Sequence, residues 1–101
     1  MYKVILMEEA GADIIEARSY YKSLVIGLEK RFKLDLKKII NKLEENPYIF
    51  GFRFSEFRTV NLPIFPYQIH YKILEENKTI IIFAVLHAYR DPNFIKSRNI
   101  Q

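Results

Sequence analysis

The stretch from Pro66 to Pro92 most limits what this chain can fold into, because it holds two strands of different character joined by a polar turn. Residues 67–74 alternate between apolar and polar side chains, a pattern typical of a strand with one covered face. Residues 79–86 are apolar almost throughout, which favours a central strand covered on both faces. The polar residues 75–78 between them predict the loop of a hairpin.

Two helical patterns precede this hairpin and predict the layer that covers the sheet. Apolar residues recur at spacings of three and four along residues 10–24, and again along residues 28–45. Gly27 separates the two patterns, and Asn46 ends the second because the residue before a proline is pushed out of helical geometry. We expect an antiparallel helical hairpin whose apolar stripes need a sheet or a partner to cover them.

The remaining segments complete an α+β fold. Residues 2–7 predict a short first strand, and residues 52–62 predict one strand that ends before the prolines at 63 and 66. We therefore expect a two-layer β-α-α-β-β-β sandwich, with the helical hairpin packed on a mostly antiparallel sheet. Residues 93–98 are expected to form a short helical turn or a last extended piece. At 101 residues, the chain is expected to be a single domain spanning 1–101.

Composition excludes several kinds of site. The chain has no cysteine, which removes disulfides, thiolate metal sites and cysteine nucleophiles together. Its three glycines are far apart, so no phosphate-binding loop is present, and no nucleophile-elbow pattern occurs. We expect neither a metal nor a cofactor. The first residues hold too few apolar side chains for a signal peptide or a membrane span, so we expect a cytoplasmic protein that contacts no membrane.

Charge is distributed unevenly along a chain whose net charge is +4. Residues 1–17 carry a net charge of −3, whereas residues 18–43 carry a net charge of +6. A basic segment of this kind can attract nucleic acid or an acidic partner, and its structural alternative is a solvated helix face.

Basic and aromatic side chains near the strand ends form the candidate site. The candidates for catalysis are Arg58, His87 and Arg90, with Tyr89 and Glu56 as weaker ones, and the candidates for binding are Arg53, Tyr67 and Arg98. If the last strands pair in sequence order, we expect Arg58, Tyr67 and His87 to approach one another across the sheet. Such a group can cleave RNA without a metal, because side chains move the two protons while arginines stabilise the charge on the phosphate. It can equally bind a phosphate or an acidic protein surface without catalysis.

These residues and their order resemble the RelE/ParE superfamily of toxins from type II toxin–antitoxin systems. The resemblance covers nearly the whole chain and rests on ADIIEARSYY at 12–21, NP at 46–47, FRTVNLPIFPYQIHYKI at 57–73 and AVLHAYRDPNFIKSR at 84–98. It implies a small basic toxin that a cognate antitoxin neutralises by lying against the basic helices and along the sheet edges. A homodimer, or a heterotetramer with the antitoxin, is the assembly expected.

The superfamily divides by target. RelE-like members cleave messenger RNA in the ribosomal A site without a metal, whereas ParE-like members poison DNA gyrase. His87, followed three residues later by Arg90, resembles the ParE side and its plasmid-stabilisation relatives. Gln68 stands where RelE-type nucleases usually place an arginine, and only Arg53 and Arg58 represent their basic patch. The resemblance therefore favours a toxin that binds an essential target such as DNA gyrase.

Two alternatives stay open. The first is a metal-independent, ribosome-dependent messenger RNA endoribonuclease, in which Arg58 and Arg90 hold the scissile phosphate while His87, Tyr89 or Glu56 moves protons. The second is a non-toxic member that only binds its antitoxin. Under the gyrase interpretation, the recognition surface is instead formed by Arg58, His87, Arg90 and Arg98.

Overall fold

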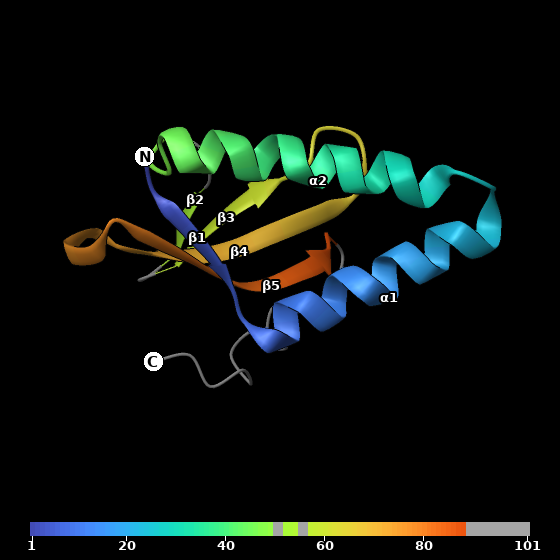
Figure 1. Ribbon diagram of the computed structural model, residues 1–101, viewed down its shortest axis with the longest axis horizontal. Coiled ribbons are helices and arrows are strands. Elements are labelled where there is room, and N and C mark those ends of the chain that lie inside the picture. Colours follow the sequence, from blue (N-terminus) through green and yellow to red (C-terminus); the bar gives the residue numbers. More distant parts are fainter. Residues whose placement is uncertain (50–51, 55–56, 89–101) are drawn as a thin grey trace.

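The computed structural model describes residues 1–49, 52–54 and 57–88, the middle segment by its backbone alone. A helical hairpin covers a mixed sheet, as Figure 1 shows. The elements are β1 (Lys3–Leu6), α1 (Glu8–Leu24), α2 (Leu28–Glu45), β2 (Phe52–Phe54), β3 (Phe57–Asn61), β4 (Tyr67–Leu74), the short 3₁₀ helix η1 (Glu75–Asn77) and β5 (Thr79–His87).

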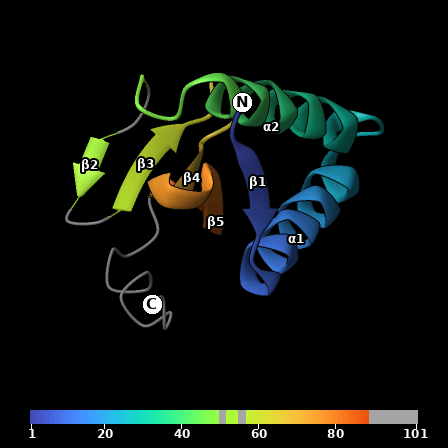
Figure 2. The same ribbon diagram turned by 60° about the vertical axis from the view of Figure 1, so that its left-hand side comes forward.

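The sheet confirms the predicted α+β class. Its five strands are ordered β1-β5-β4-β3-β2. Only β1 and β5 pair in parallel, from Lys3 opposite Thr79 to Leu6 opposite Ile82, and all the other pairs are antiparallel. β2 lies at the edge of the sheet farthest from α1 (Figure 2).

The prediction of a single strand over residues 52–62 is wrong. The structure has two antiparallel strands there, β2 and β3, with Phe54 paired to Phe57. Residues on both sides of this reversal alternate aromatic and basic side chains, so the strand pattern continues across it. Residues 55–56 are serine and glutamate; serine is a weak turn signal, and neither position holds the glycine, proline or asparagine that indicates a turn more strongly.

The core lies between the helices and the inner face of the sheet, and aromatic rings form its centre. Phe32 of α2 is completely buried and contacts Tyr21, Phe65 and Tyr67, with ring centroids 5.5, 5.4 and 5.2 Å away. The edge-to-face arrangement of Phe32 with Phe65, at an interplanar angle of 87°, is favoured by the ring quadrupoles. The helical hairpin and the end of the sheet near Tyr67 are therefore joined by one aromatic cluster.

Two connections depend on left-handed backbone. Gly27 joins the helices with a φ of 88°, a conformation that costs little only for glycine. Lys78 adopts a φ of 49° directly after η1, where the sequence predicted a plain hairpin loop. In the described residues, neither helix is long and apolar enough to cross a membrane.

A buried carboxylate holds the loop between β3 and β4 against α2. Asp35 is only 4% exposed, and its Oδ2 accepts hydrogen bonds from the backbone N–H groups of Ile64 (3.0 Å) and Phe65 (2.9 Å). These bonds fix the loop so that Phe65 enters the aromatic cluster.

Replacing Asp35 tests this anchor. We expect Asp35→Ala to lower the free energy of unfolding by about 1–3 kcal/mol, because two buried N–H groups lose their acceptor. Urea unfolding measures the loss. Asp35→Asn keeps an acceptor oxygen and should lose less, and Lys38→Ala, at an exposed position of the same helix, should be nearly neutral. Equal losses in the alanine and asparagine variants would contradict the role given to the oxygen.

Candidate functional site

A β-bulge in β5 precedes the candidate site. His70 pairs with Ala84, but the next residue of β4, Tyr71, pairs with Ile82, so Phe83 is the additional residue. Phe83 and Ala84 consequently both pack into a second apolar cluster, separate from the main core. A bulge of this kind changes the alternation of all side chains that follow it.

The bulge determines the face on which His87 lies. Before it, Ile80 and Ile82 belong to the main core under the helices, and after it Val85 does. Because strand side chains alternate with a period of two, a regular strand would have placed Val85 and His87 on the opposite face. The additional residue therefore brings His87 to the helix side of the sheet.

His87 and Tyr67 form a cross-strand pair at this end of the sheet. The two residues are register partners, and their rings meet edge to face with centroids 5.5 Å apart. Tyr67 also contacts Tyr21 of α1, with ring centroids 6.0 Å apart. The prediction that Tyr67 and His87 approach each other is thus confirmed.

An open groove runs between α1 and these residues, and we call it the Tyr67–His87 groove. It is lined by Glu16, Tyr20, Tyr21, Leu24, Pro66, Tyr67 and His87, and a smaller hollow beside it adds Asp13. Tyr20 is 55% exposed, whereas Tyr21 is 8% exposed. Burial, followed by the neighbouring Tyr67 and Tyr20, raises the pKa of Tyr21.

α1 is held over the end of β5 by a side-chain hydrogen bond. Asp13 Oδ2 accepts the backbone N–H of Val85 at 3.0 Å. β1 pairs with β5 only as far as Ile82, so Asp13 takes the place of a strand partner beyond that point. This bond fixes the distance between α1 and β5 and with it the width of the groove.

Arg58 lies at a different part of the sheet. It pairs with Tyr71 of β4, four residues from Tyr67, and β3 and β5 are separated by β4. Strand spacings place its Cα roughly 17 Å from that of His87. Its guanidinium lies 5.2 Å from the ring centroid of Tyr48, a cation–π arrangement. The expected approach of Arg58 to His87 is therefore wrong, since the two belong to different ends of β4.

Tyr48 connects Arg58 to a second polar cluster, the Glu75 clasp, formed by Tyr2, Tyr48, Glu75 and Lys78. Both tyrosine hydroxyls donate to the Glu75 carboxylate, and Lys78 Nζ lies 3.0 Å from it. The hydrogen bond with Glu75 is the main cause that raises the pKa of Tyr48 to about 12. The same bond, then Lys78 and then Tyr2, lower the pKa of Glu75 to about 2. The clasp thus ties the N-terminus and the segment after α2 to the β4–β5 hairpin.

Several predicted site residues lie outside the described part of the chain: Glu56, Tyr89, Arg90 and Arg98. Arg53 is placed by its backbone alone, opposite Arg58 in the β2–β3 pair. The described site therefore consists of Tyr67 and His87 with the α1 side chains beside them.

Glu16 and Tyr20 line the groove, but the sequence analysis did not select them. The adjacent tyrosines Tyr20 and Tyr21 could have indicated an exposed aromatic side chain. Neighbouring helix positions differ by about 100°, so two adjacent aromatics cannot both lie in a narrow apolar stripe. One of them had to be exposed, and an exposed tyrosine beside a candidate histidine indicates a binding surface.

Comparison with known proteins supports the predicted family. The sequence profile described as "ParE toxin of type II toxin-antitoxin system, parDE" matches residues 4–92. This chain belongs to the ParE toxin family of type II toxin–antitoxin systems. No curated protein sequence matches the chain significantly.

Solved structures of toxins share the fold of this ParE-family chain. A chain of the chromosomal ParDE system of P. aeruginosa has a TM-score of 0.69 and 22% identity, over 86% of this chain and 96% of that one. The isolated RelE toxin of E. coli has a TM-score of 0.58 and 17% identity, over 96% and 95%. A chain of the RelBE2 toxin–antitoxin complex of Mycobacterium tuberculosis has a TM-score of 0.56 and 18% identity, over 85% and 96%.

Among the residues described, no group of three or more histidine, aspartate or glutamate side chains is arranged to hold a metal ion. What the Tyr67–His87 groove offers is aromatic surface, phenolic hydroxyls, an imidazole and two carboxylates.

The Glu75 clasp makes a prediction about pH. The folded-state pKa of Glu75 lies below its ordinary value of 4.5. Its contacts therefore contribute fully to the stability of the fold above pH 4.5, and this contribution is lost as the pH falls through about 2. We expect Tyr48→Phe to raise the pKa of Glu75 towards 4.5, because the largest cause of the lowering is removed. A titration of the side-chain carboxyl carbon by NMR measures the change. Tyr20→Phe, which removes a hydroxyl elsewhere, should leave it at about 2, and an unchanged value in Tyr48→Phe would contradict the hydrogen bond.

Proposed function

We propose that this chain inhibits growth by binding DNA gyrase through the Tyr67–His87 groove, and that a cognate antitoxin neutralises it. Membership of the ParE toxin family supports the class of target. The similar ParDE and RelBE2 structures are toxin–antitoxin systems, which supports the antitoxin as partner. The chemistry of the groove is the observation on which the choice of a protein target rests.

The groove is better suited to a protein surface than to a phosphodiester. Cleavage of RNA needs cationic groups against the charge that grows on the phosphate. Among the described residues that line the groove there is no lysine or arginine, and Glu16 and Asp13 repel a phosphate. Arg58 is the described candidate for holding a phosphate, and its Cα lies roughly 17 Å from the Cα of His87.

Exposed tyrosines are typical of protein interfaces. Tyr20, which is exposed, and Tyr67, which is half-buried, both line the groove, and tyrosine is enriched among the residues that dominate binding energy. Tyr67 is held in place by Phe32 and Tyr21, so little conformational freedom is lost when a partner binds. Arg90 and Arg98, which lie outside the described residues, are proposed as further contacts with the target.

Induced expression without antitoxin tests the proposal, with growth, DNA supercoiling and new RNA 5′ ends followed together. Growth arrest with loss of supercoiling and intact RNA is the expected result. Arrest with messages cut in the ribosomal A site and bearing 2′,3′-cyclic phosphates would assign the endoribonuclease function instead. Normal growth at full expression would indicate a member that only binds its antitoxin.

A set of single substitutions tests the groove itself. We expect His87→Ala to raise the concentration needed for half-inhibition of purified gyrase tenfold or more, because an interface residue at the centre of the contact is lost. Glu76→Ala, at an exposed position of the distant β4–β5 hairpin, should inhibit like the parent chain. If Arg58→Ala abolishes inhibition while His87→Ala does not, the recognition surface lies at the other end of β4 and the proposal fails.

A further inference from the structure

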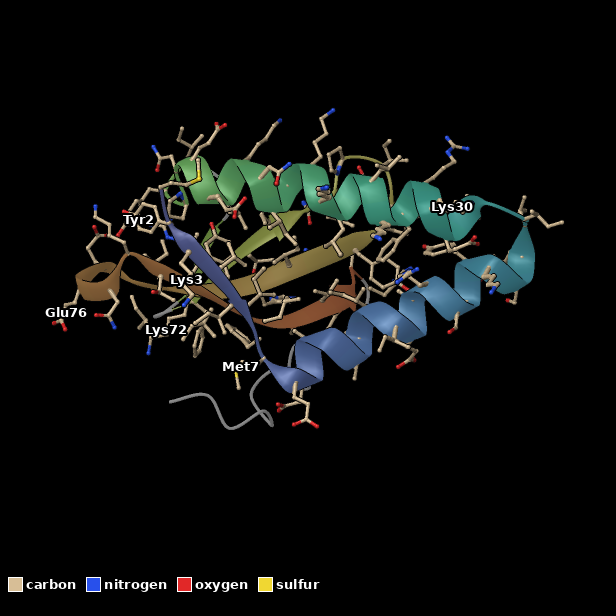
Figure 3. The ribbon with its side chains drawn as sticks, in the orientation of Figure 1. Tyr2, Lys3, Met7, Lys30, Lys72 and Glu76 are labelled. Carbon is tan, nitrogen blue, oxygen red and sulfur yellow. The ribbon has the colours of Figure 1, made fainter. Side chains whose placement is uncertain are left out.

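The solvent-facing side of α2 carries six basic side chains, and we call it the α2 basic face. It consists of Lys30, Arg31, Lys33, Lys37, Lys38 and Lys42, all of them exposed. With 3.6 residues per turn, these side chains occupy about half of the helix circumference. The opposite half carries the buried residues Phe32, Leu36, Ile39 and Leu43. In Figure 3, nitrogen-tipped side chains project from α2 away from the sheet.

Carboxylates are absent from the exposed middle part of this surface. Between residues 30 and 42 the only acid is Asp35, which is buried and already accepts the N–H groups of Ile64 and Phe65. The other acids of α2 lie at its ends, with Glu29 in the first turn and Glu44 and Glu45 in the last. Between residues 30 and 42, α2 therefore presents no exposed carboxylate to solvent.

We propose that the α2 basic face binds the phosphate backbone of double-stranded DNA. From residue 30 to residue 42 the helix rises about 18 Å, the length of roughly five base pairs. Duplex DNA carries one negative charge for about each 1.7 Å of its axis, so several phosphates lie within reach of the six cations. Exposed cations along a helix suit this regular ligand because contacts to phosphates need charge and spacing but no base recognition.

Other polyanions fit this surface less well. Proteins that bind single strands stack bases on aromatic side chains, and the only aromatic residue of α2, Phe32, is completely buried. An interface with an acidic protein usually has an apolar centre, and this face offers only Leu34 as an exposed large apolar side chain.

This surface is separate from the Tyr67–His87 groove, and its function does not depend on gyrase being the target. The groove is formed by α1, β4 and β5, whereas the cations all lie on α2. A protein with both surfaces can contact a protein partner through one and DNA through the other. Substitutions on α2 are accordingly expected to change DNA binding alone, and substitutions in the groove to change gyrase inhibition alone.

Fluorescence anisotropy with the full chain and a labelled 20-base-pair DNA duplex, at 50–200 mM KCl, tests the proposal. Four phosphate contacts would give a slope of about −4 for log affinity against log salt concentration, or roughly a 250-fold loss of affinity over this range. We expect Lys33→Glu with Lys37→Glu to reduce the slope to about −2 and to weaken binding at every salt concentration. Lys33→Arg with Lys37→Arg keeps the charges and should bind like the parent chain.

A matched control separates a local surface from net charge. Arg18→Glu with Lys22→Glu changes the net charge equally, at exposed positions of α1, and should leave the slope near −4. Equal weakening by both charge reversals would overturn the proposal, as would absence of binding at 50 mM KCl. Binding of a 20-base-pair RNA duplex or a polyglutamate peptide at least as tightly as DNA would also overturn it. Circular dichroism of each variant checks that the fold is retained.

Discussion

Burial of β5 on both faces is the constraint on which the rest of the structure depends. Ile80, Ile82 and Val85 pack under the helices, while Phe83, Ala84 and Leu86 form the second cluster with Met7 and Phe57 on the other face. A strand with two apolar faces has to be enclosed within a sheet and covered by other elements. β1 and β4 occupy its two edges, and the helical hairpin covers its inner face.

The bulge at Phe83 links this packing to the candidate site. An additional residue in β5 lets two successive apolar side chains fill the outer cluster and returns the following ones to the inner face. His87 consequently meets Tyr67 beneath α1 instead of lying on the opposite side of the sheet. Asp13 satisfies a backbone N–H that β1 is too short to reach, so the same region of β5 also positions the helix. The packing of both clusters, the end of the β1 pairing and the geometry of the site thus all depend on the bulged part of β5.

Charge is separated between the two helices, and this separation gives the molecule two different surfaces. α1 begins with acidic residues and contributes Asp13 and Glu16 to the Tyr67–His87 groove. α2 directs its cations to solvent and keeps Asp35 inside, where the carboxylate anchors a loop. The net charge of +4 describes neither surface, because a partner responds to local charge.

Periodicity in the sequence by itself determined the two helices, the β4–β5 hairpin and the α+β class, because burial of an apolar stripe or face requires those repeats. It also placed Tyr67 and His87 at neighbouring strand ends. It did not reveal that the segment 52–62 contains two strands, β2 and β3, since the strand pattern continues from one to the other with no glycine, proline or asparagine between them. Only the tertiary structure decided the bulge, the separation of Arg58 from His87 and the contribution of Glu16 and Tyr20 to the groove. These features depend on the register between strands and on the distance between α1 and β5. Both are determined by contacts between residues that are remote in the sequence.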